Sequence, residues 1–169
     1  YIVGDKPLDK KKCVLIKGIT TGKIVDYGVK DSMNMGACMA PAAAELIEAN
    51  FKDLDVDKDY YDAIFTGDLG QIGNRILSEL LKEKGIDVAD KLYDCGMLIY
   101  EGETKCSGGS GCGCSAVVLG SCIMDRLTRG EYKRVLFVPT GALLSTVSYN
   151  EGKSVPGIAH GVILEGKES

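Results

Sequence analysis

The sequence has no stretch approaching the ~18 consecutive apolar residues of a membrane-spanning helix, although 45% of its 169 residues are hydrophobic. Its first residues, YIVGDKPLDKKK, lack the apolar core of a secretory signal. We therefore expect a chain that is soluble by its own composition. Peripheral attachment to a membrane through a partner protein leaves no trace in a single chain and stays open.

Basic patches and spaced cysteine pairs are also missing. The net charge is −4, and Lys and Arg are interspersed with acidic residues, so the electrostatic signature of nucleic-acid binding is absent. The chain has seven cysteines, an odd number, and one histidine. Neither C-x-x-C pairs nor a histidine accompany Cys95, Cys106, Cys112 and Cys114. These features predict free thiols in a reducing compartment, with no metal site and no cofactor.

The length and apolar content are typical of one globular domain spanning residues 1–169. No long linker, low-complexity tract or tandem repeat interrupts it. Strand patterns occur at 13–16, 23–27, 62–66, 135–138 and 157–164, and helical spacing at 36–50, 72–81 and 116–127. This alternation predicts a layered α/β/α domain, with a mixed sheet of about five strands and helices on both faces.

The glycine-rich segment GGSGCGCS, which precedes the third predicted helix, is the strongest candidate for a ligand site. Glycines let backbone N–H groups approach a ligand, and a helix start favours negative charge. The candidate ligand-binding residues are Gly109, Ser110, Gly111, Cys112 and Gly113, and the ligand they suit is a carboxylate. Close packing and a sharp turn into a buried helix would require the same glycines, so both interpretations stay open.

Three further positions carry alternatives. Asp68 follows a predicted strand, where it would accept a hydrogen bond from a ligand, help to bind calcium, or cap the next helix. His160 is either the partner of a ligand carboxylate or a hydrogen-bonded residue within a sheet. Cys112 and Cys114 are either reactive thiolates at a helix start or small buried side chains.

Six ordered strings resemble the second half of the stage V sporulation protein AD family. They are VKDSMNMGACMAPAAAELI, YDAIFTGDLGQIG, DCGMLIY, GGSGCGCSAVV, VLFVPTGALLS and PGIAHGVILEG, and the resemblance runs from about Ile19 to about Gly166. It implies a thiolase-like fold of two similar halves, of which this chain is the carboxy-terminal one and the amino-terminal half is missing.

The resemblance also implies a function. Members of this family act in spore-forming bacteria, where they help to move dipicolinic acid, often as its calcium chelate, into the developing spore. They are thought to bind dipicolinate directly and to lie peripherally at the inner membrane of the forespore, beside membrane proteins of the same uptake complex. A homodimer of the full-length protein is expected as well.

Condensing enzymes of the thiolase superfamily use a cysteine nucleophile from the first half, and a histidine with an asparagine or second histidine from the second. The resemblance places their first histidine near Gly67 or Asp68 and their asparagine at Cys112. None of these side chains replaces an imidazole or an amide donor. A non-catalytic binding component is therefore expected, and the alternatives are an acyltransferase or ketoacyl synthase and a structural scaffold.

Overall fold

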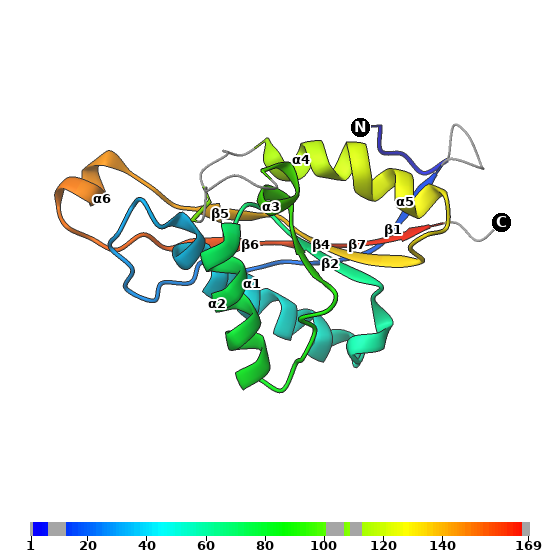
Figure 1. The fold of residues 1–169 in the computed structure, drawn as a ribbon, viewed down its shortest axis with the longest axis horizontal. Helices are drawn as coiled ribbons and strands as arrows, with labels where there is room; N and C mark the ends of the chain where they lie inside the picture. The colour runs from blue at the N-terminus through cyan, green and yellow to red at the C-terminus, as the bar shows by residue number, and fades with distance from the viewer. Residues whose placement is uncertain (1, 7–12, 101–106, 109–112, 167–169) are drawn as a thin grey trace.

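A computed structural model describes residues 2–6, 13–100, 107–108 and 113–166, and its centre is a five-stranded mixed sheet (Figure 1). The strands lie in the order β1 (Val14–Thr20), β7 (Gly161–Gly166), β4 (Arg134–Val138), β2 (Ala63–Thr66) and β3 (Leu92–Asp94). β2 is parallel to β3 and to β4, whereas β7 is antiparallel to β4 and to β1. The carboxyl ends of β2, β3 and β4 therefore meet at one edge of the sheet, which we call the carboxyl edge.

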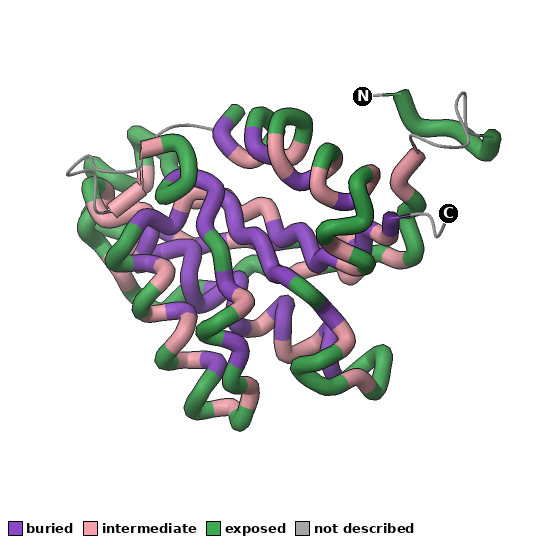
Figure 2. Tube along the Cα trace, turned by 45° about the vertical axis from the view of Figure 1, so that its right-hand side comes forward, coloured by how far each residue is buried: buried purple, intermediate pink, exposed green. Residues whose placement is uncertain are grey.

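Helices cover both faces of this sheet. The helical elements are α1 (Met35–Leu54), η1 (Lys58–Tyr60), α2 (Gly70–Glu83), α3 (Cys95–Ile99), α4 (Cys114–Val118), the π-helical η2 (Leu119–Ile123), α5 (Met124–Thr128) and α6 (Thr146–Asn150). α1 and α2 lie on one face, and the continuous helical run α4–η2–α5 lies on the other (Figure 1). Each layer has its own apolar core, and the central strands β2 and β4 between them are almost entirely buried, whereas the edge strand β1 is largely exposed (Figure 2).

None of the helices in the described ranges is long and apolar enough to cross a membrane.

α1 and α2 approach each other closely at two glycines. A Cβ atom on Gly36 would lie 2.0 Å from the carbonyl oxygen of Leu69, and one on Gly73 would lie 2.7 Å from the Cα of Gly36. Both obstructing atoms belong to the backbone, so no rotamer change relieves the clash. The two glycines therefore set how near the start of α2 comes to the start of α1.

A short chain of polar side chains crosses the buried layer beneath α1. The Tyr61 hydroxyl donates to Asn50 Oδ1 at 2.6 Å, and Asn50 Nδ2 donates to Thr20 Oγ1 at 2.8 Å. Burial raises the pKa of Tyr61, so its hydroxyl remains a donor throughout the physiological range. These hydrogen bonds join β1, α1 and Tyr61, the residue after η1, without leaving the Asn50 amide unpaired in the core.

A small lobe extends from the carboxyl edge. β5 (Thr140–Ala142) and β6 (Gly157–Ala159) form a two-stranded antiparallel sheet, and α6 lies at the end of their connection (Figure 1). Residues 21–34, which we call the docked segment, lie against this lobe. The backbone N–H and carbonyl of Val25 pair with Gly157 at 2.9 and 2.8 Å, and the N–H of Val155 donates to the carbonyl of Val29 at 2.8 Å.

The α/β class, the mixed five-stranded sheet and the helices on both faces are confirmed, but several details of the prediction differ. Residues 23–27 are not a strand: only Val25 pairs, in an isolated bridge, because β1 ends at Thr20 beside β7. The predicted strand 157–164 is divided at His160 into β6 and β7, which belong to different sheets. The short elements η1, β3, α3, β5 and α6 were not predicted, since three to five residues are too few to show a periodicity.

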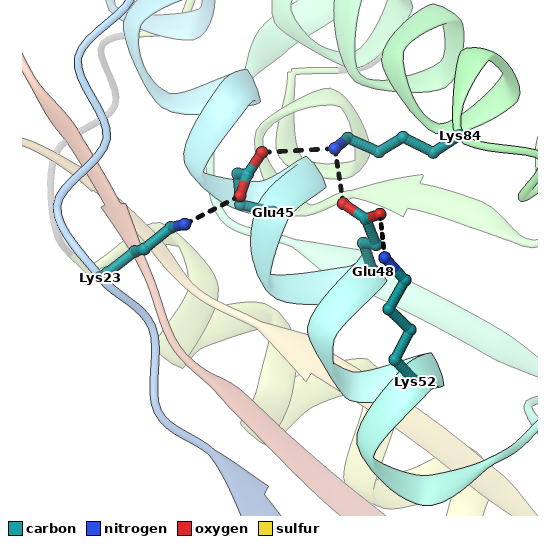
Figure 3. Close-up of polar contacts among 5 residues, drawn as sticks. All are labelled: Lys23, Glu45, Glu48, Lys52 and Lys84. Carbon is teal, nitrogen blue, oxygen red and sulfur yellow. Dashed lines mark hydrogen bonds and ion pairs between the residues drawn. The ribbon is translucent and has the colours of Figure 1, made fainter.

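Five charged side chains join the docked segment, α1 and the end of α2 (Figure 3). Lys84 Nζ lies 3.3 Å from Glu45 Oε1 and 2.5 Å from Glu48 Oε2. Lys52 Nζ lies 2.7 Å from Glu48 Oε1, and Lys23 Nζ lies 3.1 Å from Glu45 Oε2. Hydrogen bonds from Lys23 and from Lys52 hold the pKa of Glu45 and of Glu48, respectively, below the ordinary glutamate value. The hydrogen bond to Glu48 raises the pKa of Lys84.

We expect Lys84→Met to lower the free energy of unfolding by about 1 kcal/mol at neutral pH, and by less in about 0.5 M salt. Carboxyl groups with lowered pKa values stabilise the fold above the ordinary glutamate pKa of 4.5, and that stabilisation is lost as the pH falls below it. The difference between the variant and the wild type should therefore shrink in acid. Urea unfolding of both proteins at several pH values measures this, with Lys82→Met at an exposed position as the control. A difference that is equally large in acid would contradict the account.

Candidate ligand site at the carboxyl edge

Asp94, the last residue of β3, organises the carboxyl edge. It is 2% exposed and accepts four hydrogen bonds. The donors are Thr66 Oγ1 at 2.8 Å, the backbone N–H groups of Leu69 and Gly70 at 2.8 and 3.1 Å, and the N–H of Met97 at 3.1 Å. One carboxylate thus caps the starts of both α2 and α3 and ties them to the end of β2.

Burial raises the pKa of Asp94, although each of the four hydrogen bonds opposes the shift. The N–H groups at the start of α2 are the natural donors for an anion at this edge. Because Asp94 already accepts from Leu69 and Gly70, an external carboxylate cannot use them without displacing an internal one. The start of α2 is therefore a structural element of this edge.

Gly67 and Asp68 follow β2 and fit tightly between neighbours. A Cβ atom on Gly67 would lie 2.5 Å from Thr140 Oγ1 and 2.9 Å from the Thr140 nitrogen, so this position admits only glycine unless the backbone moves. The side chain of Asp68 lies toward α3, since a Cβ atom on Gly96 would be 1.9 Å from Asp68 Oδ1. Asp68 is half-buried and does not take the capping role at α2, which belongs to Asp94.

The described ends of the glycine-rich segment adjoin Asp68 and α3. Gly108 has a φ of +80°, and a Cβ atom there would lie 2.5 Å from the carbonyl oxygen of Asp68. Ser107 is fixed to α1, because its carbonyl accepts from the Gly36 N–H at 2.9 Å. Of the predicted ligand-binding residues in this segment, Gly109, Ser110, Gly111 and Cys112 lie outside the described residues.

Gly113, the fifth residue predicted in the segment, is the exposed residue before α4. Gly113 itself has no side chain to cap this helix, and within the described ranges a Cβ atom on it would meet nothing within 4 Å. The helical run continues from Cys114 to Thr128. Asp94, which caps α2 and α3, does not bond to the start of α4, and Cys114 and Ala116 near that start take part in further interactions.

His160 lies at the junction of β6 and β7, and its contacts are structural. The ring nitrogen Nδ1 accepts a hydrogen bond from the Gly22 N–H at 3.1 Å. The backbone N–H of His160 donates to the Pro139 carbonyl at 3.3 Å. The structure thus brings Asp68 and Gly108 together and places α4 beside α3, while His160 contacts the docked segment and the end of β4. A ligand contact of His160 stays a prediction.

The cysteines that the structure describes are free thiols, which agrees with the prediction for them. Burial raises the pKa of Cys95, so this thiol stays protonated. Cys114 is buried at the start of α4, as one of its two interpretations required. Within the described ranges, no three His, Cys, Asp or Glu side chains are placed to hold a metal ion.

Sequence reasoning missed Asp94, which the structure places at the centre of this edge. A signal was present: an aspartate follows Leu92 and Tyr93 and precedes CGMLI, the pattern of a helix N-cap after a short strand. The burial of Asp94 and its bonds to α2 could not be read from that pattern, because they depend on the pairing of β2 with β3.

Residues 4–165 of the chain match the family model described as "Stage V sporulation protein AD". The chain belongs to the stage V sporulation protein AD family. It is 47% identical over 153 residues to stage V sporulation protein AD of Bacillus subtilis (strain 168), an alignment that covers 90% of this chain and 45% of that protein. The chain therefore spans less than half the length of this relative of the family.

Solved structures place this family member in the thiolase-like class of α/β folds. It superposes on MvaS in complex with 3-hydroxy-3-methylglutaryl coenzyme A with a TM-score of 0.54, at 14% identity, over 90% of this chain and 40% of MvaS. For 3-oxoacyl-(acyl carrier protein) synthase III, FabH, from Pseudomonas aeruginosa PAO1, the TM-score is 0.50 at 12% identity, over 92% of this chain and 51% of FabH. Identities this low establish the shared fold alone.

Proposed function

We propose that the chain is the carboxy-terminal half of a non-catalytic binding component for dipicolinic acid, or its calcium chelate, in the uptake machinery of the developing spore. Membership of the stage V sporulation protein AD family and the thiolase-like fold support this proposal. The proposed setting is peripheral, at the inner membrane of the forespore, as a homodimer beside membrane proteins of the same complex.

The environment of Gly67 is the observation that carries the non-catalytic part. A condensing enzyme needs an imidazole in this region. At Gly67 even a Cβ atom would collide with the backbone and hydroxyl of Thr140, and at Asp68 the side chain is a carboxylate that lies against Gly96. Neither position offers the neutral donor that stabilises a developing oxyanion.

The start of α4 is the part of this half best suited to a dicarboxylate. Asp94 caps α2 and α3, whereas α4 begins at the exposed Gly113, which has no side chain of its own. Backbone N–H groups at a helix start are donors for an anion, and dipicolinate carries two carboxylates. A calcium ion bound together with dipicolinate would draw its protein ligands from Asp68 and from residues outside the described ranges.

Calorimetric titration of the full-length protein with dipicolinate, and separately with an acyl-coenzyme A, tests the proposal. We expect saturable dipicolinate binding and no thioester turnover, with weaker binding of picolinate, which has one carboxylate. Turnover of the thioester would identify a condensing enzyme instead. No response to either compound would favour a structural scaffold, and both of these results reject the proposal.

A further inference from the structure

His160 accepts a hydrogen bond through a ring atom that can be protonated. Its Nδ1 lies 3.1 Å from the backbone nitrogen of Gly22, which has a hydrogen to donate. Accepting that hydrogen requires a lone pair on Nδ1, so the bond exists only while the imidazole is neutral, with its hydrogen on Nε2. This contact is the first one that the docked segment makes with the β6–β7 junction.

Gly22 is held against this junction without a side chain. A Cβ atom on Gly22 would lie 1.7 Å from the Ala159 carbonyl oxygen, so only glycine allows this approach. Further along the docked segment, Val25 pairs with Gly157, and Asp26 accepts from the Ser154 hydroxyl at 2.6 Å. Successive contacts therefore hold the docked segment along its length. At its start, these are the hydrogen bond from Gly22 to His160 and the ion pair of Lys23 with Glu45.

We propose that His160 is a proton-operated latch for residues 21–24. When the imidazole takes up a proton from solvent, both ring nitrogens carry hydrogens and Nδ1 becomes a donor. The Gly22 N–H then loses its acceptor and faces another N–H, so residues 21–24 separate from the junction. The bridge between Val25 and Gly157 consists of backbone hydrogen bonds, which do not titrate, so it stays formed and restricts the separation to residues 21–24.

The charged groups on the surrounding elements favour this outcome. The docked segment contributes Lys23 and Asp26, which bind Glu45 and Ser154, and also Lys30 and Asp31. The charged residues of α1 are Glu45, Glu48, Lys52 and Asp53, and β1 carries Lys17, which pairs with Glu165. On β4 and β7, the charged residues are Arg134 and Glu165 at the far end of the strands, while β5 and β6 carry none. The carboxylates of Glu45 and Asp26 on these elements bind Lys23 and Ser154, and in the described part of the chain none is paired with the imidazole. In this arrangement no ion pair offsets the lost hydrogen bond.

The latch adjoins the candidate ligand site. The N–H of His160 donates to the carbonyl of Pro139, and the next residue, Thr140, is the one that confines Gly67. Opening of residues 21–24 would loosen the end of β1 next to this edge. The inference concerns a proton and the chain itself, and it holds whatever ligand the protein binds.

Hydrogen–deuterium exchange of the full-length protein, measured by mass spectrometry on peptides that cover 19–27, tests the latch. After correction for intrinsic exchange rates, we expect exchange in these peptides to be faster at about pH 5.5 than at about pH 7.5. The loss of one hydrogen bond corresponds to an increase of about tenfold. Peptides of α2 serve as the internal reference and should not change.

Two substitutions at His160 separate the latch from a general effect of acid. In His160→Asn, Oδ1 can accept from Gly22 but does not titrate, so exchange should be slow at both pH values. In His160→Leu the acceptor is gone, and exchange should be fast at both. The proposal is overturned if His160→Asn keeps the pH dependence of the wild type, or if His160→Leu exchanges as slowly as the wild type at the higher pH.

Discussion

Replacing Asp94 with alanine is expected to lower the free energy of unfolding by about 3–5 kcal/mol. The change leaves three backbone N–H groups without their acceptor at a position that is 2% exposed, and the Thr66 hydroxyl keeps only the Tyr93 carbonyl at 3.2 Å. It also uncaps α2 and α3 at once. Chemical denaturation of the purified variant measures the loss.

Two further substitutions sharpen this test. Asp94→Asn keeps one acceptor oxygen but turns an amide N–H₂ group toward the donors, so it should cost less than alanine and still be destabilising. Asp90→Ala, at an exposed residue four positions earlier, is the matched control and should change stability by less than about 0.5 kcal/mol. If Asp94→Ala behaves like the control, Asp94 does not hold the carboxyl edge together.

The second large effect is expected at the crossing of α1 and α2. In a helix, Gly→Ala is ordinarily stabilising by about 1 kcal/mol. At Gly73 the added methyl group would lie 2.7 Å from backbone atoms of Gly36, so we expect the opposite sign and a loss of about 3 kcal/mol or more.

Gly141→Ala is the control for this change, because its Cβ would meet Ile158 Cγ2 at an ordinary 3.5 Å. We expect it to shift the thermal midpoint only slightly, whereas Gly73→Ala should lower the midpoint clearly. A stabilising effect at Gly73 would show that helix propensity outweighs the close packing of the two helices.

The local sequence patterns were enough to predict the helices and strands that form the layers of this fold. They were not enough to predict which segments pair at the edges of the sheets. The apolar stripe of α2 and the continuous apolar strand Val135–Val138 predicted elements that the structure confirms. Residues 23–27 have the composition of a strand, yet the neighbour on the sheet is β7, and it pairs with β1 instead. The break at His160 arises because β6 pairs with β5 while β7 pairs with β4, a choice between partners that no local pattern encodes.

The candidate site was predictable in its region and less so in its residues. The positions after β2 and before α4 were identified because glycines and an aspartate follow strand-like or precede helix-like patterns. Asp94 was missed because its importance comes from long-range partners on α2 and β2. The role of His160 was left between two interpretations, and its contact with Gly22 lies 138 residues away along the chain.

The most direct test of the proposed function is the affinity of the full-length protein for dipicolinate with an aspartate or an asparagine at position 113. Within the described ranges a Cβ atom at position 113 meets nothing within 4 Å, and both side chains suit a helix start, so both variants should remain folded. Gly113→Asp also places a negative charge where the ligand carboxylate is proposed to bind. We predict that Gly113→Asn retains affinity within about threefold and that Gly113→Asp loses at least about tenfold, with thermal midpoints unchanged. Equal affinity of Gly113→Asp and the wild type, or no saturable binding by the wild type, would contradict the account.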